Sequence, residues 1–438
     1  MNKFFLLCTL IFSIGNAQSS DWFEAQKEKS LNFLLENISR NDTPKGFIVA
    51  SPSKTDPNYY YHWVRDAALV MQAIDKTIDF GSKKQELFNN YISLVNHHQT
   101  IFSLTGLGEP KYNADGTSFT GPWGRPQNDG PALRSIALIK YAFKLIENGQ
   151  LDFVREKLYH SSLPANSVIK RDLEYVAANW KNHDFDLWEE VKGHHFYTRM
   201  AQRTAMRLGA KLAMKLNDAH ASNWYFHQAT LIDSELENHW SSNRGYIATT
   251  LDRVGGLDYK HENLDASVIL AVNHSWIPGQ NYGPADSKVI ATFEALVRRF
   301  KEVYPINNSF TGAAIGRYPE DRYYGGNPWF LLTNAMAEYL FKLDRVLAGK
   351  SLIQLDNNNR LFYTRILGKS LSKKSKLSYI EVGQARKMIR MEANAFIKRV
   401  KTHMGPSGRM DEQLDKYSGH MLGARDLTWS YASFITIK

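Results

Sequence analysis

Helical periodicity runs through almost the whole chain, and it limits the possible folds more than any other feature. Apolar residues recur three and four positions apart in one segment after another, and this spacing is typical of amphipathic helices. Strand-like runs are few, and the best of them is residues 246–251. The predicted helices, twelve in number, are residues 20–38, 62–78, 84–103, 129–147, 167–182, 194–217, 219–236, 262–273, 286–304, 327–346, 378–402 and 420–436.

Twelve helices in one domain indicate six helical hairpins arranged in a ring. The segments 62–78, 129–147 and 327–346 carry apolar or small residues on more than one face, as expected of helices that are buried on two sides. These helices would belong to an inner ring, with the alternate helices packed outside it. The sequence therefore predicts an all-α fold with a closed, two-layered ring.

The connections between the predicted helices are more informative than the helices themselves. Aromatic and charged sequences precede helices two, four, six, ten and twelve, in the connections 51–62, 105–128, 184–193, 306–326 and 403–419. In an alternating ring, every connection that enters an even-numbered helix lies at the same end. The chemically distinctive side chains are therefore expected to face one mouth of the ring.

One of these connections places Trp188, Glu189 and Glu190 in succession. An aromatic ring offers its face to the C–H side of a sugar, and a carboxyl group in a dry environment can keep a proton and act as a general acid. Adjacent glutamates close to a helix start also commonly do no more than compensate the helix dipole. Taken alone, the pair leaves both interpretations open.

The N-terminus has the pattern of a secretory signal peptide over residues 1–17. Lys3 precedes a short apolar stretch, and Gly15-Asn-Ala17 forms a small-x-small cleavage site. The stretch is too short for a comfortable membrane span, and no later segment is apolar for long enough to cross a bilayer. We therefore expect an exported protein, extracellular or periplasmic, with no membrane association after cleavage.

Composition excludes several other classes of protein. The only cysteine, Cys8, lies in the leader, so the mature chain would have no disulfide. The net charge is +10, but the basic residues are dispersed apart from the serine- and lysine-rich segment 369–376, and no nucleic-acid-binding module is present. His194 and His195 lack the HExxH spacing. We expect no metal, no cofactor and no nucleic-acid partner, and a monomeric chain.

Several motifs occur in a fixed order along the chain. They are Tyr-His-Trp-Val-Arg-Asp (61–66), Gly-Glu-Pro-Lys-Tyr-Asn (108–113), Trp-Gly-Arg-Pro-Gln-Asn-Asp-Gly-Pro-Ala-Leu-Arg (123–134), Asp-Leu-Trp-Glu-Glu-Val (186–191), Gly-Arg-Tyr-Pro-Glu-Asp (316–321), Tyr-Tyr-Gly-Gly-Asn-Pro-Trp-Phe-Leu (323–331) and Asp-Leu-Thr-Trp-Ser-Tyr-Ala (426–432). Any one of them is weak, but together they are highly specific. On these residues the chain resembles the glucoamylases of glycoside hydrolase family 15, the fungal-type members above all, from about residue 20 to the C-terminus.

The resemblance implies an (α/α)6 barrel of six helical hairpins, with the active site in a funnel at one end. It implies an exo-acting hydrolase that releases β-D-glucose from the non-reducing ends of starch, glycogen and maltooligosaccharides by inversion. By motif position, Glu189 corresponds to the general acid and Glu412 to the general base. The residues expected to bind substrate are Tyr59, Trp63, Arg65, Asp66, Trp123, Arg125, Trp188, Glu190, Arg317, Asp321, Tyr323, Trp329 and Trp429.

The chemistry of these residue types agrees with that assignment. Inverting hydrolysis needs a protonated carboxyl at the leaving oxygen and a carboxylate on the opposite face, about 6.5–9.5 Å apart. Glu189 and Glu412 are more than 200 residues apart in sequence, so only the fold can bring them together. Arg65 and Arg317 would supply rigid forks of donors, and Trp123 would be the platform beside the scissile bond.

Two alternatives remain open. One keeps the fold but acts on α-1,6-linked glucans or trehalose, although the intact segments 123–127 and 317–321 favour starch-type substrates. The other is a non-catalytic glucan-binding protein, which the presence of both glutamates disfavours. No linker or starch-binding domain follows the motifs, so residues 18–438 are expected to form one catalytic domain with poor activity on granular starch.

The chain also departs from the family pattern. His62 stands where threonine is usual, and Phe119 stands where tyrosine is common. Such changes could alter the pH optimum or the affinity at the rim of the site, but not the class of reaction.

Overall fold

Every predicted helix is present in the computed structural model, which describes residues 21–309 and 311–437. The predicted signal peptide lies outside the described residues. The first helix covers residues 21–35 of the described chain. The others are α2 (Val64–Thr77), α3 (Ser82–His98), α4 (Asp129–Glu147), α6 (Val168–Asn179), α7 (Phe196–Lys215), α8 (Ala219–Glu237), α9 (Ser267–Ser275), α10 (Ser287–Val303), α11 (Phe330–Ala348), α13 (Tyr379–His403) and α14 (Thr428–Ile435).

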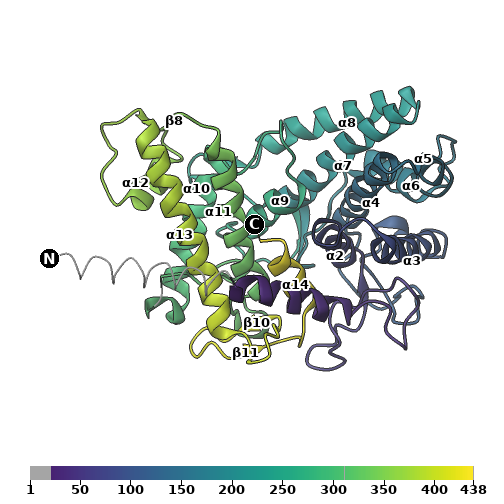
Figure 1. The fold of residues 1–438 in the computed structure, drawn as a ribbon, viewed down its shortest axis with the longest axis horizontal. Helices are drawn as coiled ribbons and strands as arrows, with labels where there is room; N and C mark the ends of the chain where they lie inside the picture. The colour runs from purple at the N-terminus through teal and green to yellow at the C-terminus, as the bar shows by residue number, and fades with distance from the viewer. Residues whose placement is uncertain (1–20, 310, 438) are drawn as a thin grey trace.

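The helices form an inner and an outer layer (Figure 1). The inner helices contact one another in the cycle α2, α4, α7, α9, α11 and α14, and α14 returns to pack against α2. Outside this ring, α8 packs on α7, α13 on α11, and α6 on both α4 and α7. The prediction of an all-α (α/α)6 barrel is confirmed, and the contact between α14 and α2 closes the ring.

Burial distinguishes the two layers in the way that the sequence predicted. The inner helix α2 buries 12 of its 14 residues, whereas the outer helix α3 buries 7 of its 17. Ala67, Ala68 and Ala73 have almost no exposed surface, and their small side chains let neighbouring inner helices approach closely. An inner helix must therefore be apolar or small on nearly every face, while an outer helix needs only one apolar stripe.

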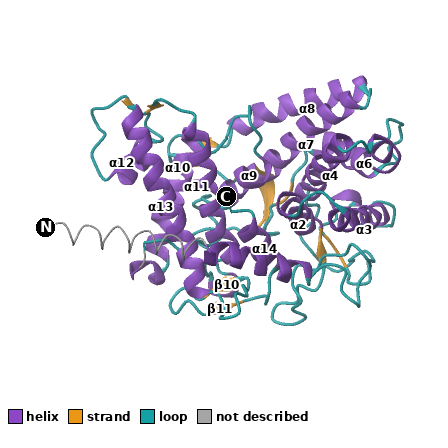
Figure 2. Ribbon diagram, viewed as in Figure 1, coloured by secondary structure: helices purple, strands orange, loops and turns teal. Residues whose placement is uncertain are grey.

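Short strands are confined to the connections between helices (Figure 2). They are β1 (His62–Trp63), β2 (Lys111–Tyr112), β3 (Asp184–Phe185), β4 (Val191–His195), β5 (Trp240–Ser241), β6 (Tyr246–Ile247), β7 (Thr250–Gly256), β8 (Ile353–Gln354), β9 (Lys376–Leu377), β10 (Gln413–Leu414) and β11 (Met421–Leu422). They pair antiparallel as β1 with β2, β3 with β4 and β4 with β7, β5 with β6, β8 with β9, and β10 with β11. The predicted strand 246–251 is divided between β6 and β7.

Several short helical elements were not predicted. They are α5 (Leu151–Phe153), α12 (Arg360–Leu367), the 3-10 segments η1 (Gly106–Gly108), η3 (Pro305–Ser309) and η4 (Tyr323–Gly325), and the π-helical turn η2 (Val154–Leu158). Each is too short to show a repeated apolar pattern in the sequence. Within the described residues, no helix is both long and apolar enough to cross a membrane.

The connections that enter the inner helices meet at one end of the barrel. Residues from the connections that enter α2, α4, α7, α11 and α14, or from the first turns of these helices, line a single cavity. These inner helices therefore begin at the same end, as the alternation argument predicted. Helix N-termini carry partial positive charge, which favours the carboxylates of Asp66 and Asp129 in the first turns of α2 and α4.

Candidate active site

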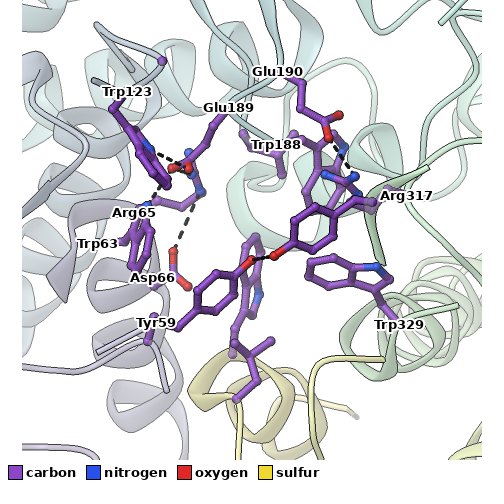
Figure 3. A pocket seen from close by; sticks show the side chains of 16 residues that line it. Tyr59, Trp63, Arg65, Asp66, Trp123, Trp188, Glu189, Glu190, Arg317 and Trp329 are labelled. Carbon is purple, nitrogen blue, oxygen red and sulfur yellow. Dashed lines mark hydrogen bonds and ion pairs between the residues drawn. The ribbon is translucent and has the colours of Figure 1, made fainter. Parts of the chain in front are cut away.

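A cavity of about 320 Å³ opens at this end of the barrel, within the size range of small-molecule sites. Figure 3 shows its side chains converging from the connections described above. The predicted residues that line it are Tyr59, Trp63, Arg65, Asp66, Trp123, Trp188, Glu189, Glu190, Arg317, Tyr323, Trp329 and Trp429. Ala50, Gly124, Leu187 and Leu427 complete the lining. Arg125, Asp321 and Glu412 do not line it.

The Glu189 carboxylate lies among N–H donors on one side of the cavity (Figure 3). Trp63 Nε1 donates to its Oε1 over 2.6 Å, and Trp123 Nε1 donates to its Oε2 over 2.7 Å. Arg65 Nη2 lies 3.3 Å from the same Oε1. Each carboxylate oxygen thus has a fixed partner, so the orientation of the group is set by three side chains from two other connections.

Glu189 belongs to the turn of a β-hairpin and not to the start of a helix. The turn joins β3 to β4, and α7 begins only at Phe196. Glu189 has a left-handed backbone with φ of +67°, a conformation that non-glycine residues seldom adopt, and its amide donates to Asp186 O over 2.8 Å. The interpretation of the pair as compensation for a helix dipole is therefore wrong.

Arg65 is held rigidly beside Glu189 by carboxyl and amide groups. Its Nη1 donates to Asp129 Oδ2 over 2.7 Å, and its Nη2 donates to Gln127 Oε1 over 3.1 Å. The neighbouring Asp66 lines the cavity, and its pKa is raised to about 7 by burial and by the nearby charges of Glu189 and Asp129, with Arg65 acting in the opposite direction. This side of the cavity combines a fixed cation with acceptors for hydroxyl groups.

Glu190 faces the other side of the cavity, where it pairs with Arg317 (Figure 3). Arg317 Nη2 lies 2.7 Å from Glu190 Oε1, and Tyr318 donates to Glu190 Oε2 over 2.6 Å. Arg317 also donates to both oxygens of Asp321, over 2.6 and 2.8 Å. Asp321 therefore does not contact the cavity as the sequence predicted, but fixes the plane of the Arg317 guanidinium from behind.

Glu412 is fully buried next to the cavity. Its Oε2 accepts hydrogen bonds from Gln413 Nε2 over 3.1 Å and from the amide of Ala424 over 3.3 Å. Among the described residues, Oε1 accepts no hydrogen bond. Tyr59 and Tyr323, which do line the cavity, join their hydroxyls over 2.7 Å.

Glu412 and this tyrosine pair influence one another's pKa values. Burial raises the pKa of Glu412 to about 7, and the Tyr59 hydroxyl and the Arg317 guanidinium act to lower it. Burial and the charge of Glu412 in turn raise the pKa of Tyr59 and that of Tyr323. The Glu412 carboxyl group therefore interacts electrostatically with the two tyrosines that line the cavity, and it has no exposed surface.

Indole rings form the walls and the rim of the cavity. Trp188 lies at the centre, with ring centroids 5.9 Å from Trp329 and 6.5 Å from Trp429, the latter nearly parallel. These three rings are at most 8% exposed, whereas Trp123 is 39% exposed. The buried rings close the inner end of the cavity, and Trp123 offers an open face at its mouth.

Arg125 is a correction to the predicted set. Its Nε and Nη2 donate to Glu109 Oε1 over 3.0 and 2.8 Å, and its remaining donors bind the carbonyls of Phe119 and Gly121. Its guanidinium is therefore occupied within its own connection. Arg125 braces the loop that carries Trp123 and does not reach the cavity.

Sequence reasoning missed Lys111, which lies beneath the Trp123 platform. Its Nζ is 3.2 Å from the ring centroid of Trp123, 4.1 Å from that of Phe119 and 4.3 Å from that of Tyr61. Cation–π attraction of this kind holds rings in place. All four residues lie in or near the quoted motifs, but no sequence pattern shows that they converge.

The unusual His62 faces away from the cavity. It alternates with Trp63 on β1, so its ring packs 5.0 Å from Phe47 and its Nδ1 accepts the amide of Ile48 over 3.2 Å. Burial lowers the pKa of His62 to about 3. The ring therefore stays neutral, and this departure from the family pattern does not reach the site.

The histidines near the hairpin have protein partners. His194 stacks on His183 and its Nδ1 lies 3.0 Å from Asp252 Oδ2, while His195 is buried between Thr250 and the carbonyl of Asp184. In the part of the chain that the structure describes, no group of three His, Cys, Asp or Glu side chains is arranged to hold a metal ion.

The architecture and the site together define a class of protein. A double ring of helices has an aromatic-walled cavity at the end where its inner helices begin, with carboxyl groups held on different sides, as glycoside hydrolysis requires. Carboxyl groups, arginine forks and indole faces are kinds of group that suit the recognition of a neutral sugar. The chain is a glycoside hydrolase built on an (α/α)6 barrel.

Comparison with known proteins identifies the family. The sequence profile described as "Glycosyl hydrolases family 15" matches residues 25–438. A glucoamylase from Blastobotrys adeninivorans is 35% identical in an alignment that covers 94% of this chain and 70% of the relative's chain. An intracellular sporulation-specific glucoamylase from Saccharomyces cerevisiae is 31% identical in an alignment that covers 97% of this chain and 85% of the relative's chain. The structure of a family 15 glucoamylase from Hypocrea jecorina superposes with a TM-score of 0.88, at 32% identity, over 95% of this chain and 71% of that one. The chain belongs to glycosyl hydrolase family 15 and is an enzyme of the glucoamylase type.

Proposed function

We propose that this enzyme removes β-D-glucose from the non-reducing ends of starch, glycogen and maltooligosaccharides, with inversion at the anomeric carbon. The observation that carries the proposal is the pair of carboxyl groups in unlike surroundings, Glu189 among donors at the cavity and Glu412 buried with one unbonded oxygen. Trp188 and Trp429 close the inner end of the cavity. A closed end favours attack on the terminal sugar of a chain over attack within it.

Glu189 is proposed as the general acid. In its protonated form it gives its proton to the glycosidic oxygen as the bond from that oxygen to the anomeric carbon breaks. Trp63 and Trp123 hold the carboxyl group in place before the transfer and stabilise the carboxylate after it. Their fixed geometry means that little reorganisation is needed at the moment of reaction.

Glu412 is proposed as the general base. Its unbonded Oε1 is free to accept a proton from a water molecule, whose oxygen then attacks the anomeric carbon on the face opposite the leaving group. Burial makes the carboxylate more basic, because a desolvated carboxylate gains more from accepting a proton. The hydroxyls of Tyr59 and Tyr323 lie where they can orient that water.

The remaining cavity residues are proposed to bind the substrate. Arg65 and Asp66 on one side, and Glu190 and Arg317 on the other, offer donors and acceptors for the hydroxyls of the first glucose. The half-exposed ring of Trp123 would stack on the next sugar. Asp321 acts through Arg317, and Arg125 acts through the loop of Trp123.

The product anomer tests the function directly. Purified enzyme is incubated with maltoheptaose, and the anomeric protons of the products are followed by NMR from the first minute. We expect β-glucose to appear first and the α form to follow only by mutarotation. Maltose as the first product, or α-glucose before β-glucose, would contradict the proposal. Parallel rates on isomaltose and trehalose test the two substrate alternatives.

Export is proposed from the leader pattern at residues 1–17. The intracellular relative from Saccharomyces cerevisiae makes this a point to be tested and not assumed. Expression of the full chain followed by N-terminal sequencing should give a protein that begins at Gln18. An unprocessed N-terminus would contradict export. The single catalytic domain and the monomeric state also remain predictions, and light scattering measures the second.

A further inference from the structure

A buried cluster of three charged side chains lies behind the turn that presents Glu189. Lys260 Nζ is 2.6 Å from Asp265 Oδ2 and 3.5 Å from Asp186 Oδ2. All three residues are at most 3% exposed, and none lines the cavity. They come from two segments that are distant in the sequence: Asp186 lies in the hairpin turn after β3, and Lys260 and Asp265 lie in the connection between β7 and α9.

Each carboxylate of this cluster also holds a part of the site. Asp186 Oδ1 accepts the amides of Glu190 and Val191, over 2.8 and 3.1 Å. Asp265 accepts the Trp188 Nε1 proton, with 3.0 and 3.1 Å to its two oxygens. Asp186 therefore fixes the backbone that follows Glu189, and Asp265 fixes the side chain of Trp188, the residue that precedes Glu189.

Lys260 keeps these two carboxylates together. Two buried anions facing the same space would repel each other. Among the described residues, each of them forms its ion pair with Lys260, so removing this cation would leave both carboxylates without an ion-pair partner. The ammonium also lies 4.1 Å from the ring centroid of Tyr318, whose hydroxyl donates to Glu190. One side chain thus touches three groups that hold Trp188, the Glu189 turn and Glu190.

The turn has a specific need for such support. The left-handed backbone of Glu189 costs free energy that the surrounding contacts must offset, and such conformations persist only where the structure holds them. We propose that Lys260 is a positioning residue for the general acid, tying Asp186 to Asp265 so that the turn keeps Glu189 directed at the glycosidic oxygen. This inference rests on the proposed role of Glu189.

Two substrates with different leaving groups distinguish a misplaced general acid from a general loss of activity. Maltoheptaose needs a proton on its leaving oxygen, whereas α-D-glucosyl fluoride releases fluoride with far less help from an acid. In Lys260→Met we expect kcat/KM on maltoheptaose to fall by about 10- to 100-fold, the size of effect that a misplaced catalytic group produces. The loss on α-D-glucosyl fluoride should stay below about threefold.

A matched control is available in Lys170, a lysine of α6 that is equally buried, pairs with Asp218 over 2.8 Å and, like Asp218, does not line the cavity. Lys170→Met should lose stability without changing the ratio of the two rates. Asp265→Asn provides a second variant, because it keeps the shape and an acceptor for Trp188 but removes the charge paired with Lys260. Asp265→Asn should lower the rate on maltoheptaose more than the rate on α-D-glucosyl fluoride, by a smaller factor than Lys260→Met does. If Lys260→Met does not fold, Asp265→Asn tests the positioning role in its place.

Glu189→Gln, measured in the same assay, separates the two proposals. If it shows the selective loss on maltoheptaose while the Lys260 and Asp265 variants lose both activities equally, the positioning role is wrong and the acid role stands. If Glu189→Gln itself loses both activities equally, the acid role is wrong and the inference fails with it. Selective loss in all three variants supports both.

Discussion

The two proposed catalytic carboxyl groups, one lining the cavity and the other buried next to it, are held in opposite ways. Glu189 faces the cavity and is bonded by Trp63 and Trp123, with Arg65 close by. Glu412 has no exposed surface, and burial raises its pKa to about 7. Glu189 is therefore controlled mainly by the hydrogen bonds that orient its carboxyl group, and Glu412 mainly by the loss of water around its carboxyl group.

The supports of the two groups also come from different distances along the chain. The partners of Glu189 lie in the connections before α2 and α4, so three separate segments must assemble correctly. The hydrogen bonds of Glu412 come from Gln413 and Ala424, within its own connection. We therefore expect changes in remote segments to disturb Glu189, the proposed acid, more than Glu412, the proposed base.

The largest expected effect tests the different roles proposed for Glu189 and Glu412. Glu412→Gln should lower kcat by about 10²–10⁴-fold on maltoheptaose and on α-D-glucosyl fluoride alike, because both substrates need an activated water. Glu189→Gln should lose a similar factor on maltoheptaose alone. Steady-state rates on the two substrates measure this, with Glu235→Gln on the half-exposed surface of α8 as the control. Identical profiles for both glutamine variants would remove the proposed division of roles.

A smaller effect is expected at the arginine on the far side of the cavity. Arg317→Lys keeps the charge but loses the two parallel bonds to Asp321, so the grip on the first glucose should weaken. We expect kcat/KM on maltose to fall by about 100-fold, which corresponds to about 2.7 kcal/mol. Arg134→Lys breaks an equally buried pair with Asp172 away from the cavity. It should lower the melting temperature and leave KM unchanged; an equal rise in KM would contradict a binding role for Arg317.

The donors of Glu189 give the next prediction. Trp123→Phe removes the N–H that binds Oε2 while keeping an aromatic face, and a hydrogen bond to a charged group contributes about 1.5–3 kcal/mol. We expect kcat on maltoheptaose to fall by about 10- to 100-fold. The rate on α-D-glucosyl fluoride should change less, since the acid matters less there. A loss confined to KM would mean that Trp123 serves only as a platform.

The smallest expected change is a shift in pH dependence at Glu412. A general base works only when deprotonated, so activity is present above its pKa and is lost as the pH falls through it. With a pKa of about 7, the acid limb of kcat/KM should lie well above the value of about 4.3 for an unperturbed glutamate. Tyr59→Phe removes a hydroxyl that lowers this pKa, so the limb should move to still higher pH.

A pH profile of kcat/KM on maltose measures the shift. Tyr225→Phe is the control, because it removes another buried tyrosine hydroxyl that is bonded to a glutamate, Glu174, outside the cavity. It should leave the acid limb in place. A limb that stays fixed or moves to lower pH in Tyr59→Phe would contradict the assignment of that limb to Glu412.

Much of the fold could be predicted because the apolar pattern that marks each helix lies within a short segment of the sequence. The inner helices are marked by apolar or small residues on several faces, which is a property of each segment by itself. The alternation of the ring then places five connections at one end without further knowledge. The helix α12 and most of the short strands were not predicted, because such short segments show little periodicity by themselves; the strand-like run 246–251 is the exception.

The sequence predicted which residues lie in or near the site better than it predicted where their side chains point. Trp123 and Arg125 are two positions apart in one motif, yet the first lines the cavity and the second braces its loop. Loop backbones have no fixed period, so neighbours in a motif give no indication of which side chain points inwards. Asp321 was assigned to the wall for the same reason, although it acts from behind Arg317.

The sequence alone determined the helical ring, the end at which its unusual connections gather and, through the motif order, the residues that belong there. These follow from periodicity and from the identity of residues within short segments. Only the tertiary structure decided that Glu189 sits on a hairpin turn, that Glu412 is buried behind Tyr59, and that Lys260 ties two distant aspartates together. Burial, direction and pairing depend on contacts between residues far apart in the chain, and those contacts exist only once the ring has closed.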